Sequence, residues 1–142
     1  MTTKVAIVGS RYFPSETKCK QFIVQNVIKD RPNLEFVSGG AIGVDSWAYE
    51  LYEQSDKVTD FKLFKPDWDK HGKKAGFLRN VEIIDYADEV YAFWDSTSRG
   101  TKHSIDLAFK AGKLVKIVLP TVTAYRLTKI SNPKLQDYLT HL

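Results

Sequence analysis

Three glycines stand close together at the start of a helix-forming segment, and their spacing is typical of an anion-binding turn. Gly39, Gly40 and Gly43 lie within the run 38–45, directly after a predicted strand. Bare backbone N–H groups and the positive end of a helix attract phosphate. Asp45 falls in the first helical turn, where it can cap the helix or accept hydrogen bonds from a ribose hydroxyl. A turn that needs glycine only for packing is the alternative, but one turn seldom needs three glycines.

A second run of the same physical type precedes another helix-forming segment. It contains hydroxyl groups, an arginine and a glycine, contributed by Ser96, Ser98, Arg99, Gly100 and Thr101. We interpret it as a second phosphate-binding turn. Serine and threonine are also common helix caps, which is the alternative explanation.

A third turn follows the first predicted strand and combines Gly9, Ser10 and Arg11. Gly9 permits a sharp turn and a close approach of a ligand to the backbone. Arg11 can donate charge-assisted hydrogen bonds to a phosphate. A tight turn that carries a surface arginine explains the same residues equally well.

The segment 65–80 holds five basic and two acidic residues together with one tryptophan. Trp68 can stack on a base, and Arg79 and Asn80 fall within a predicted helix. A solvated loop with a structural tryptophan is the alternative. The histidines show no metal-ligand spacing, and the single cysteine, Cys19, lies on an apolar helix face and is expected in the core.

Five short apolar runs must position these turns. They are Lys4–Val8, Leu34–Val37, Phe61–Phe64, Glu89–Trp94 and Leu114–Leu119. Continuous apolar runs separated by helical segments indicate a parallel sheet covered on both faces. The sequence therefore predicts an α/β fold, a Rossmann-like doubly wound parallel sheet of about five strands with helices on both faces. Ligands of such sheets bind beyond the carboxyl ends of the strands, where all of these turns lie.

Four helices are expected between the strands, the first of them capped by Ser15 and the last ended by Gly112. Apolar residues recur along each at helical spacing. The expected core-facing residues are Cys19, Phe22, Ile23 and Val27, with Asn26 on the same face; Val44, Trp47, Ala48, Leu51 and Tyr52; Phe77, Leu78, Val81 and Ile84; and Ile105, Ala108 and Phe109.

Composition agrees with one globular domain over residues 1–142, with a core at about 4–119 and an extension at 120–142 that adds one short helix after Pro133. The net charge of +4 mildly favours an anionic partner. No segment has the length of a membrane span or the features of a signal peptide, so we expect a cytoplasmic protein without membrane contact.

Five motifs in order resemble the SLOG superfamily of Rossmann-like domains, and in particular its small stand-alone branch. They are G-S-R at 9–11, G-G-A-I-G-V-D at 39–45, P-D-W at 66–68, G-F-L-R-N at 76–80, and A-D-E-V-Y-A-F-W-D at 87–95 followed by S-R-G-T at 98–101. The superfamily includes the LOG phosphoribohydrolases and proteins similar to the DNA-processing protein DprA. The resemblance implies a nucleotide or ADP-ribose-like (NAD-derived) ligand and a homo-oligomer.

The comparison with the LOG enzymes bears on catalysis. Gly100 and Thr101 match the glycine–threonine pair of their motif, but the position of their catalytic glutamate is occupied by Ser104. Asp106 lies two residues further on, which turns its side chain by about 200° around a helix. It is therefore a poor substitute for that glutamate.

Three functions follow from these observations. The first is a module that binds a nucleotide or nucleotide-derived ligand as a sensor or sequestering protein, with Ala41 and the other residues of the turns above as contacts. The second is hydrolysis or transfer at an N-glycosidic bond, for which Asp45, Asp95 and Asp106 are the candidate catalytic residues. The third is DprA-like binding of single-stranded DNA, which the charge permits, although the basic residues form no continuous stripe.

Overall fold

A six-stranded parallel sheet forms the centre of the molecule, in a computed structural model that describes residues 2–121 and 132–142. The strands lie in the order β3-β2-β1-β4-β5-β6. This order is that of a doubly wound Rossmann fold and confirms the predicted fold class. The strands are β1 (Thr3–Gly9), β2 (Leu34–Ser38), β3 (Val58–Leu63), β4 (Glu89–Phe93), β5 (Leu114–Leu119) and β6 (Leu139–His141).

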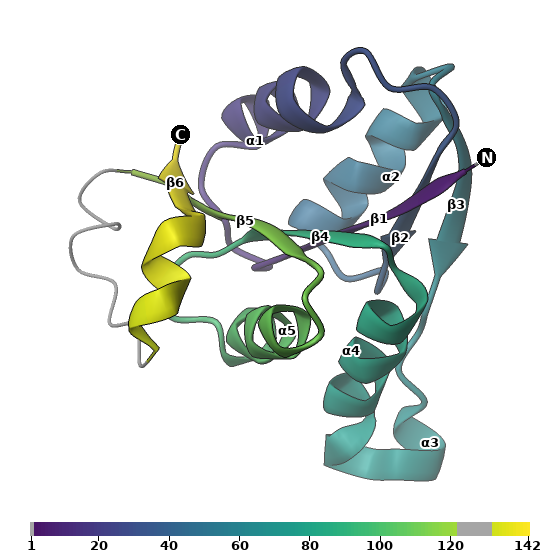
Figure 1. Cartoon of the computed structure of the whole chain (residues 1–142). Coiled ribbons are helices and arrows are strands. Elements are labelled where there is room, and N and C mark those ends of the chain that lie inside the picture. Colours follow the sequence, from purple (N-terminus) through teal and green to yellow (C-terminus); the bar gives the residue numbers. More distant parts are fainter. Residues whose placement is uncertain (1, 122–131) are drawn as a thin grey trace.

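Helices cover both faces of the sheet (Figure 1). On one face lie α1 (Glu16–Ile23), which continues into the π-helical turn η1 (Val24–Ile28), and α2 (Val44–Gln54). The other face carries α4 (Ala75–Tyr86) and α5 (Arg99–Lys110). The short helix α3 (Trp68–His71) and the 3-10 turn η2 (Gly72–Lys74) lead into α4, and the 3-10 helix η3 (Pro133–Tyr138) precedes β6.

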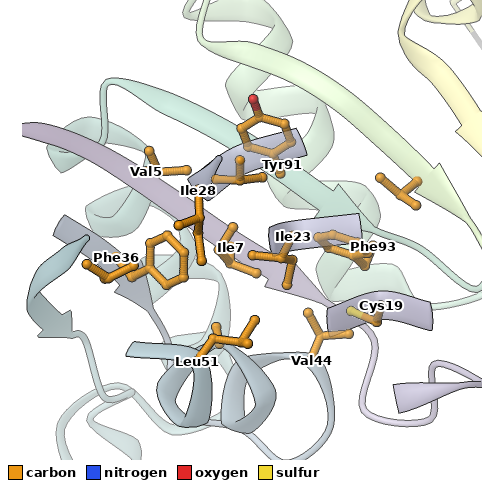
Figure 2. Close-up of a cluster of buried hydrophobic side chains, with 14 of the residues drawn as sticks. Val5, Ile7, Cys19, Ile23, Ile28, Phe36, Val44, Leu51, Tyr91 and Phe93 are labelled. Carbon is orange, nitrogen blue, oxygen red and sulfur yellow. The ribbon is translucent and has the colours of Figure 1, made fainter. Parts of the chain in front are cut away.

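The core beneath α1 and α2 is one cluster of buried hydrophobic side chains (Figure 2). Phe36 and Phe93 are fully buried, as is Cys19. Burial raises the pKa of the Cys19 thiol to about 12, with a further rise from Glu16. The thiol is therefore protonated at neutral pH and acts as a small apolar side chain, as predicted.

The core beneath α4 differs from the prediction. Phe77, Leu78 and Val81 were expected in the core, but their side chains are 47%, 41% and 37% exposed. Ile84, which was also expected in the core, is buried there, and it shares the buried face of α4 with Ala75, Asn80 and Ile83. Apolar residues stand on two faces of α4. The face that packs against the sheet is the one that also contains the small Ala75 and the polar Asn80.

Several boundaries also differ. The π-helical turn η1 adds a residue to its turn, so that Val27 and Ile28 are both buried while Asn26 is exposed. Strand β3 begins three residues earlier than predicted. Only one short helix was expected after Pro133, but β6 follows it and pairs with β5. Residues 122–131 of the expected extension lie outside the described residues.

Helix lengths bear on membrane insertion as well. Within residues 2–121 and 132–142, no helix combines the length and apolar character needed to span a bilayer.

Candidate nucleotide-binding site

A cavity of about 500 Å³ opens at the carboxyl edge of the sheet, beside the point between β1 and β4 where the strand order reverses. It lies between the loops after β1, β2 and β4 and the first turns of α4 and α5. Most residues predicted from the sequence line it, namely Gly9, Arg11, Gly39, Ala41, Asp45, Trp68, Arg79, Asn80, Ser98, Gly100 and Thr101.

The loop after β2 is held in shape by Asp45. Its carboxylate accepts a hydrogen bond from the Ala41 N–H at 3.0 Å, and also from Gly39 and Ser38. Burial raises the pKa of Asp45 to about 6, although these hydrogen bonds and the nearby charge of Arg79 act in the opposite direction. Asp45 thus positions the loop, and several N–H groups of the predicted phosphate-binding turn already donate to protein acceptors.

Two glycines of this loop stand where an added side chain would collide with neighbouring groups. A Cβ atom on Gly39 would lie 2.1 Å from a guanidinium nitrogen of Arg79. Gly43 has φ +79°, and a Cβ there would lie 2.4 Å from the Arg11 carbonyl oxygen. The glycines therefore let the loops after β1 and β2 and helix α4 approach one another closely.

Arg79 and Asn80 tie the two predicted phosphate-binding turns together. The Arg79 guanidinium donates to the Gly39 carbonyl at 2.7 Å and to Asn80 Oδ1 at 3.1 Å. Asn80 Nδ2 in turn donates to the Gly100 carbonyl at 3.3 Å. Two adjacent residues of α4 thereby fix the loop after β2 relative to the start of α5.

The loop after β4 is an Asx-type turn built on Asp95. Its Oδ1 accepts hydrogen bonds from the N–H groups of Thr97 and Ser98 at 2.9 and 2.8 Å. Burial acts to raise the pKa of Asp95, but these bonds outweigh it and the net pKa is lowered. Ser98 then caps α5, because its hydroxyl accepts from the Thr101 N–H. The positive end of a twelve-residue helix is therefore directed at the cavity.

Positive charge gathers around the cavity. Arg11, Lys73 and Arg79 line it, with Asp45 and Asp95 as the acidic residues of the lining. Burial lowers the pKa of the Arg79 guanidinium; Asp45 opposes this effect, and the positive charge of Arg11 adds to it. Both arginines line the same cavity, where their guanidinium groups can attract an anion.

Three aromatic side chains form the outer part of the lining. Tyr12 is 81% exposed, Trp68 53% and Phe77 47%. Phe77 packs edge-on against His103, with ring centroids 4.7 Å apart. Exposed aromatic faces beside cations are the combination that stacks on nucleobases.

The other predicted residues lie in the same loops but do not line the cavity. Ser10 is buried, and its hydroxyl accepts a hydrogen bond from the Asp95 N–H at 3.1 Å. Arg99 is exposed outside the cavity. The remaining predicted residues outside the lining are Gly40, Gly43 and Ser96.

Asp106, a candidate catalytic residue, does not line the cavity. It pairs with Lys102 at 3.5 Å on the exposed side of α5. Ser104, which occupies the position of the LOG glutamate, is 2% exposed and does line the cavity. The helical rotation expected from the sequence accounts for both placements.

Sequence reasoning missed several lining residues. Tyr12, Lys73 and Thr97 lie in the predicted loops, beside residues that were selected. Ser104 follows Gly100 by four residues, so helical spacing from the predicted turn was a usable signal. Phe77 was assigned to the core, and no signal in the sequence distinguished the two apolar faces of α4.

A second cavity, of about 510 Å³, lies on the other side of the loop after β2. Its lining includes Tyr49, Tyr52, Phe61 and Leu63 from α2 and β3. The three rings pack together, with Tyr49 and Phe61 edge-on at 5.2 Å. Ala41, Asp45 and neighbouring loop residues separate this cavity from the first.

Sequence comparison identifies a relative from a bacteriophage. The Gene 61 protein of Mycobacterium phage D29 is 37% identical over 114 residues, which cover 77% of this chain and 90% of that protein. The chain belongs to the Gene 61 protein family. No family model matches the sequence of this Gene 61 family member.

A solved structure shares the fold. The DNA processing protein A of Helicobacter pylori superposes with a TM-score of 0.59 at 24% identity. The match covers 84% of the Gene 61 family chain but only 65% of the other, so the chain spans less than two thirds of that protein. The H. pylori structure describes a single-stranded DNA binding mode. At this identity the likeness establishes a common Rossmann-like fold.

Proposed function

We propose that the cavity at the carboxyl edge of the sheet binds a phosphorylated nucleotide or nucleotide-derived ligand, in a protein of the SLOG superfamily. The observation that carries the proposal is the meeting of three cations and three exposed aromatic rings around one cavity of about 500 Å³. Nucleotides are common ligands that present both an anion and a flat ring. With such a site, the protein would act as a sensor of this nucleotide ligand or would sequester it.

The phosphate binds beside Arg11 and Arg79, next to the first turn of α5. The guanidinium groups supply charge-assisted hydrogen bonds, and the end of a helix stabilises an anion. Arg11, Lys73 and Arg79 outnumber the acidic residues Asp45 and Asp95 in the lining, so the cavity carries an excess of positive charge that favours an anion.

The base stacks on the aromatic side chains of the outer lining. Trp68 offers the largest ring and is half-exposed on α3, while Phe77 is held by its contact with His103. Stacking accepts any base, because every base has a π face, so we expect modest selectivity among bases.

Single-stranded DNA is the second candidate ligand. Tyr12, Trp68 and Phe77 are all exposed at the outside of the cavity, where a neighbouring nucleotide of a strand can reach them. The fold relative from H. pylori is described as a binder of single-stranded DNA. In this case one nucleotide of the strand occupies the cavity.

Cleavage of the N-glycosidic bond ranks behind binding. The carboxylates that line the cavity are Asp45 and Asp95, and both accept hydrogen bonds from their own loops. Ser104 stands where the LOG enzymes carry a catalytic glutamate. We expect no base to be released when nucleoside monophosphates are incubated with the protein and separated by chromatography.

Calorimetric titration tests the proposal. The panel contains nucleoside mono-, di- and triphosphates, ADP-ribose and oligodeoxythymidylates of increasing length. Arg11→Gln is expected to weaken binding about 10-fold through the lost charge-assisted contact. Trp68→Ala is expected to weaken it about 5- to 100-fold through lost stacking.

Lys57→Gln is the matched control. It also removes one exposed positive charge, but Lys57 immediately precedes β3 at the amino edge of the sheet, opposite the cavity. The Lys57→Gln variant is expected to bind the ligands of the panel as tightly as the unmodified protein does. If Arg11→Gln and Lys57→Gln lost the same affinity, the effect would be one of net charge alone. If the folded protein bound no member of the panel, the proposal would be refuted.

A further inference from the structure

The second cavity, between α2 and β3, is lined mainly by apolar side chains. Tyr49 and Tyr52 of α2 and Phe61 and Leu63 of β3 form its wall, and its volume of about 510 Å³ falls within the range of small-molecule sites. Among the residues that the structure describes, Asp45 is the one charged member of the lining. The cavity therefore suits an uncharged flat ring, whereas a phosphate would be repelled by the Asp45 carboxylate.

Two of the wall residues are more exposed than a role in the core requires. Tyr52 and Phe61 are partly buried against the core beneath α2. Tyr49 and Leu63, in contrast, are 45% and 40% exposed. Tyr49 packs edge-on against Phe61, with ring centroids 5.2 Å apart, and this contact holds the tyrosine ring in place. The cavity thus offers a fixed, accessible aromatic ring on which a base can stack.

The loop after β2 divides the second cavity from the first. Gly39 lines the first cavity and Gly40 the second, and consecutive Cα atoms lie about 3.8 Å apart. Ala41 lines both cavities. On the side of the first cavity, the Arg79 guanidinium donates to the Gly39 carbonyl at 2.7 Å, so a cation stands directly beside the dividing loop. One ligand can therefore hold a phosphate in the first cavity and reach over this loop into the second.

Gly40 is the glycine of the predicted phosphate-binding turn that the first cavity leaves unexplained. Its φ is +74°, and an added Cβ would lie 2.7 Å from Leu63 Cδ1 in the wall of the second cavity. A side chain at this position would collide with that wall. The glycine thus brings the dividing loop close to β3 without filling the space between them.

The aromatic residues of the two cavities come from opposite faces of the sheet. Trp68 and Phe77 belong to α3 and α4, whereas Tyr49 belongs to α2, and α2 and α4 cover different faces (Figure 1). Both cavities open at the loop after β2, at the carboxyl edge. A ligand that crosses this edge meets aromatic rings on each side, and it meets cations in the first cavity.

We propose that the second cavity binds the second nucleobase of a ligand in which two nucleosides are joined through phosphate. The inference rests on the proposed function, because the first nucleoside and the phosphate occupy the first cavity. The second base stacks on Tyr49 and packs beside Leu63. Two kinds of ligand share this chemistry, namely nucleotides linked 3′ to 5′, as in a strand, and dinucleotides linked 5′ to 5′ through a diphosphate.

Calorimetric titration with pairs of ligands that differ by one nucleoside tests the inference. Deoxyadenosine 3′,5′-bisphosphate is compared with the dinucleotide pdApdA, and ADP is compared with diadenosine diphosphate. Both members of a pair have two phosphates, and the two-base member carries no more negative charge, so a gain in affinity reports the second nucleoside. The two-base member is expected to bind about 5- to 100-fold more tightly, as one stacked base provides. The pair that shows the gain identifies the linkage.

Tyr49→Ala is expected to lower the affinity for the two-base member about 5- to 100-fold and so to abolish the difference within the pair. Tyr49→Phe keeps the ring and is expected to keep the gain. Tyr138→Ala is the matched control, because it truncates a tyrosine that lines neither cavity and is expected to keep the gain as well. Circular dichroism verifies that each variant is folded.

The possible failures are distinguishable. If the one-base members bind and the two-base members bind equally well, the inference is overturned while the proposed function stands. If no ligand binds the folded protein, the proposed function fails and the inference fails with it. A gain that survives Tyr49→Ala would place the second base outside the second cavity. An equal loss for both members of a pair would show that Tyr49 only supports the dividing loop, which would also overturn the inference.

Discussion

Asp45 links the shape of the site to its charge. The residue is only 6% exposed, yet its carboxylate holds the loop after β2 through Ala41, and it lines both cavities beside that loop. The sequence identified Asp45 as a helix cap or a ribose ligand. In the structure the carboxylate accepts from the loop that precedes the helix, so its first task is to position the loop residues that line the cavity.

The raised pKa of Asp45 makes a prediction about stability. A carboxyl with a folded pKa of about 6, against 3.8 ordinarily, stabilises the fold fully below pH 3.8, and this contribution is lost as the pH rises through 6. Asp45→Asn does not titrate, but its amide oxygen can still accept from the Ala41 N–H. The free energy of unfolding of Asp45→Asn, relative to the unmodified protein, is therefore expected to rise by about 2 kcal/mol between about pH 4.5 and about pH 8.

Urea unfolding at several pH values measures this difference. Asp106→Asn serves as the control, because that carboxylate is 40% exposed and lies outside the cavity. A difference for Asp45→Asn that stays constant across the pH range would show that the carboxyl titrates normally.

At the scale of elements, the loops after the strands were predictable and the faces of α4 were not. Parallel strands bring their carboxyl ends to one edge, so the turns at Gly9, Gly39 and Ser98 had to meet once the strands were recognised. In α4, apolar residues stand on two faces, with Leu78 and Val81 on the exposed one and Ile83 and Ile84 on the buried one. Asn80 lies on the buried face and donates to the Gly100 carbonyl, a long-range contact that no local pattern reveals.

The short elements were missed for a related reason. Strand β6 has three residues, Leu139–His141, too few for a periodic signal. It exists because the unpaired edge of β5 is available to it, and because Leu135 of η3 is buried beside that edge. Tertiary pairing of this kind cannot be derived from the composition of the segment.

Because the loops after β1 and β2 lie close together, we expect alanine to destabilise the protein more at Gly43 than at Gly72. Gly43 and Gly72 have similar backbone angles, φ 79° and ψ −130° against φ 57° and ψ −135°. An added Cβ meets the Arg11 carbonyl at 2.4 Å in the first case and nothing within 4 Å in the second. Gly72→Ala is expected to cost about 1–3 kcal/mol from backbone strain, and Gly43→Ala at least about 2 kcal/mol more.

Chemical denaturation of both variants measures the contrast. Because the strain is nearly matched, the excess cost of Gly43→Ala reports the packing between the loops after β1 and β2. Equal costs would show that these loops have room to separate, which would remove the basis for a preformed cavity.

At the scale of the whole molecule, the parts have separate tasks. The doubly wound sheet brings three loops to one edge, and α4 and α5 complete the cavity. The 65% coverage of the H. pylori protein agrees with a chain that shares a Rossmann-like core with a larger protein. The function of this chain then depends on the residues at its cavity and not on the shared fold.

Amide chemical-shift mapping during titration with a nucleotide and with an oligodeoxythymidylate tests the central claim most directly. The nitrogen-15-labelled chain is expected to show saturable shifts at Gly39, Ala41, Gly100 and Thr101, together with the Trp68 indole N–H. Shifts confined to Tyr49, Tyr52 and Phe61 would move the ligand to the second cavity. No saturable shift in the cavity with any phosphorylated ligand would contradict the account.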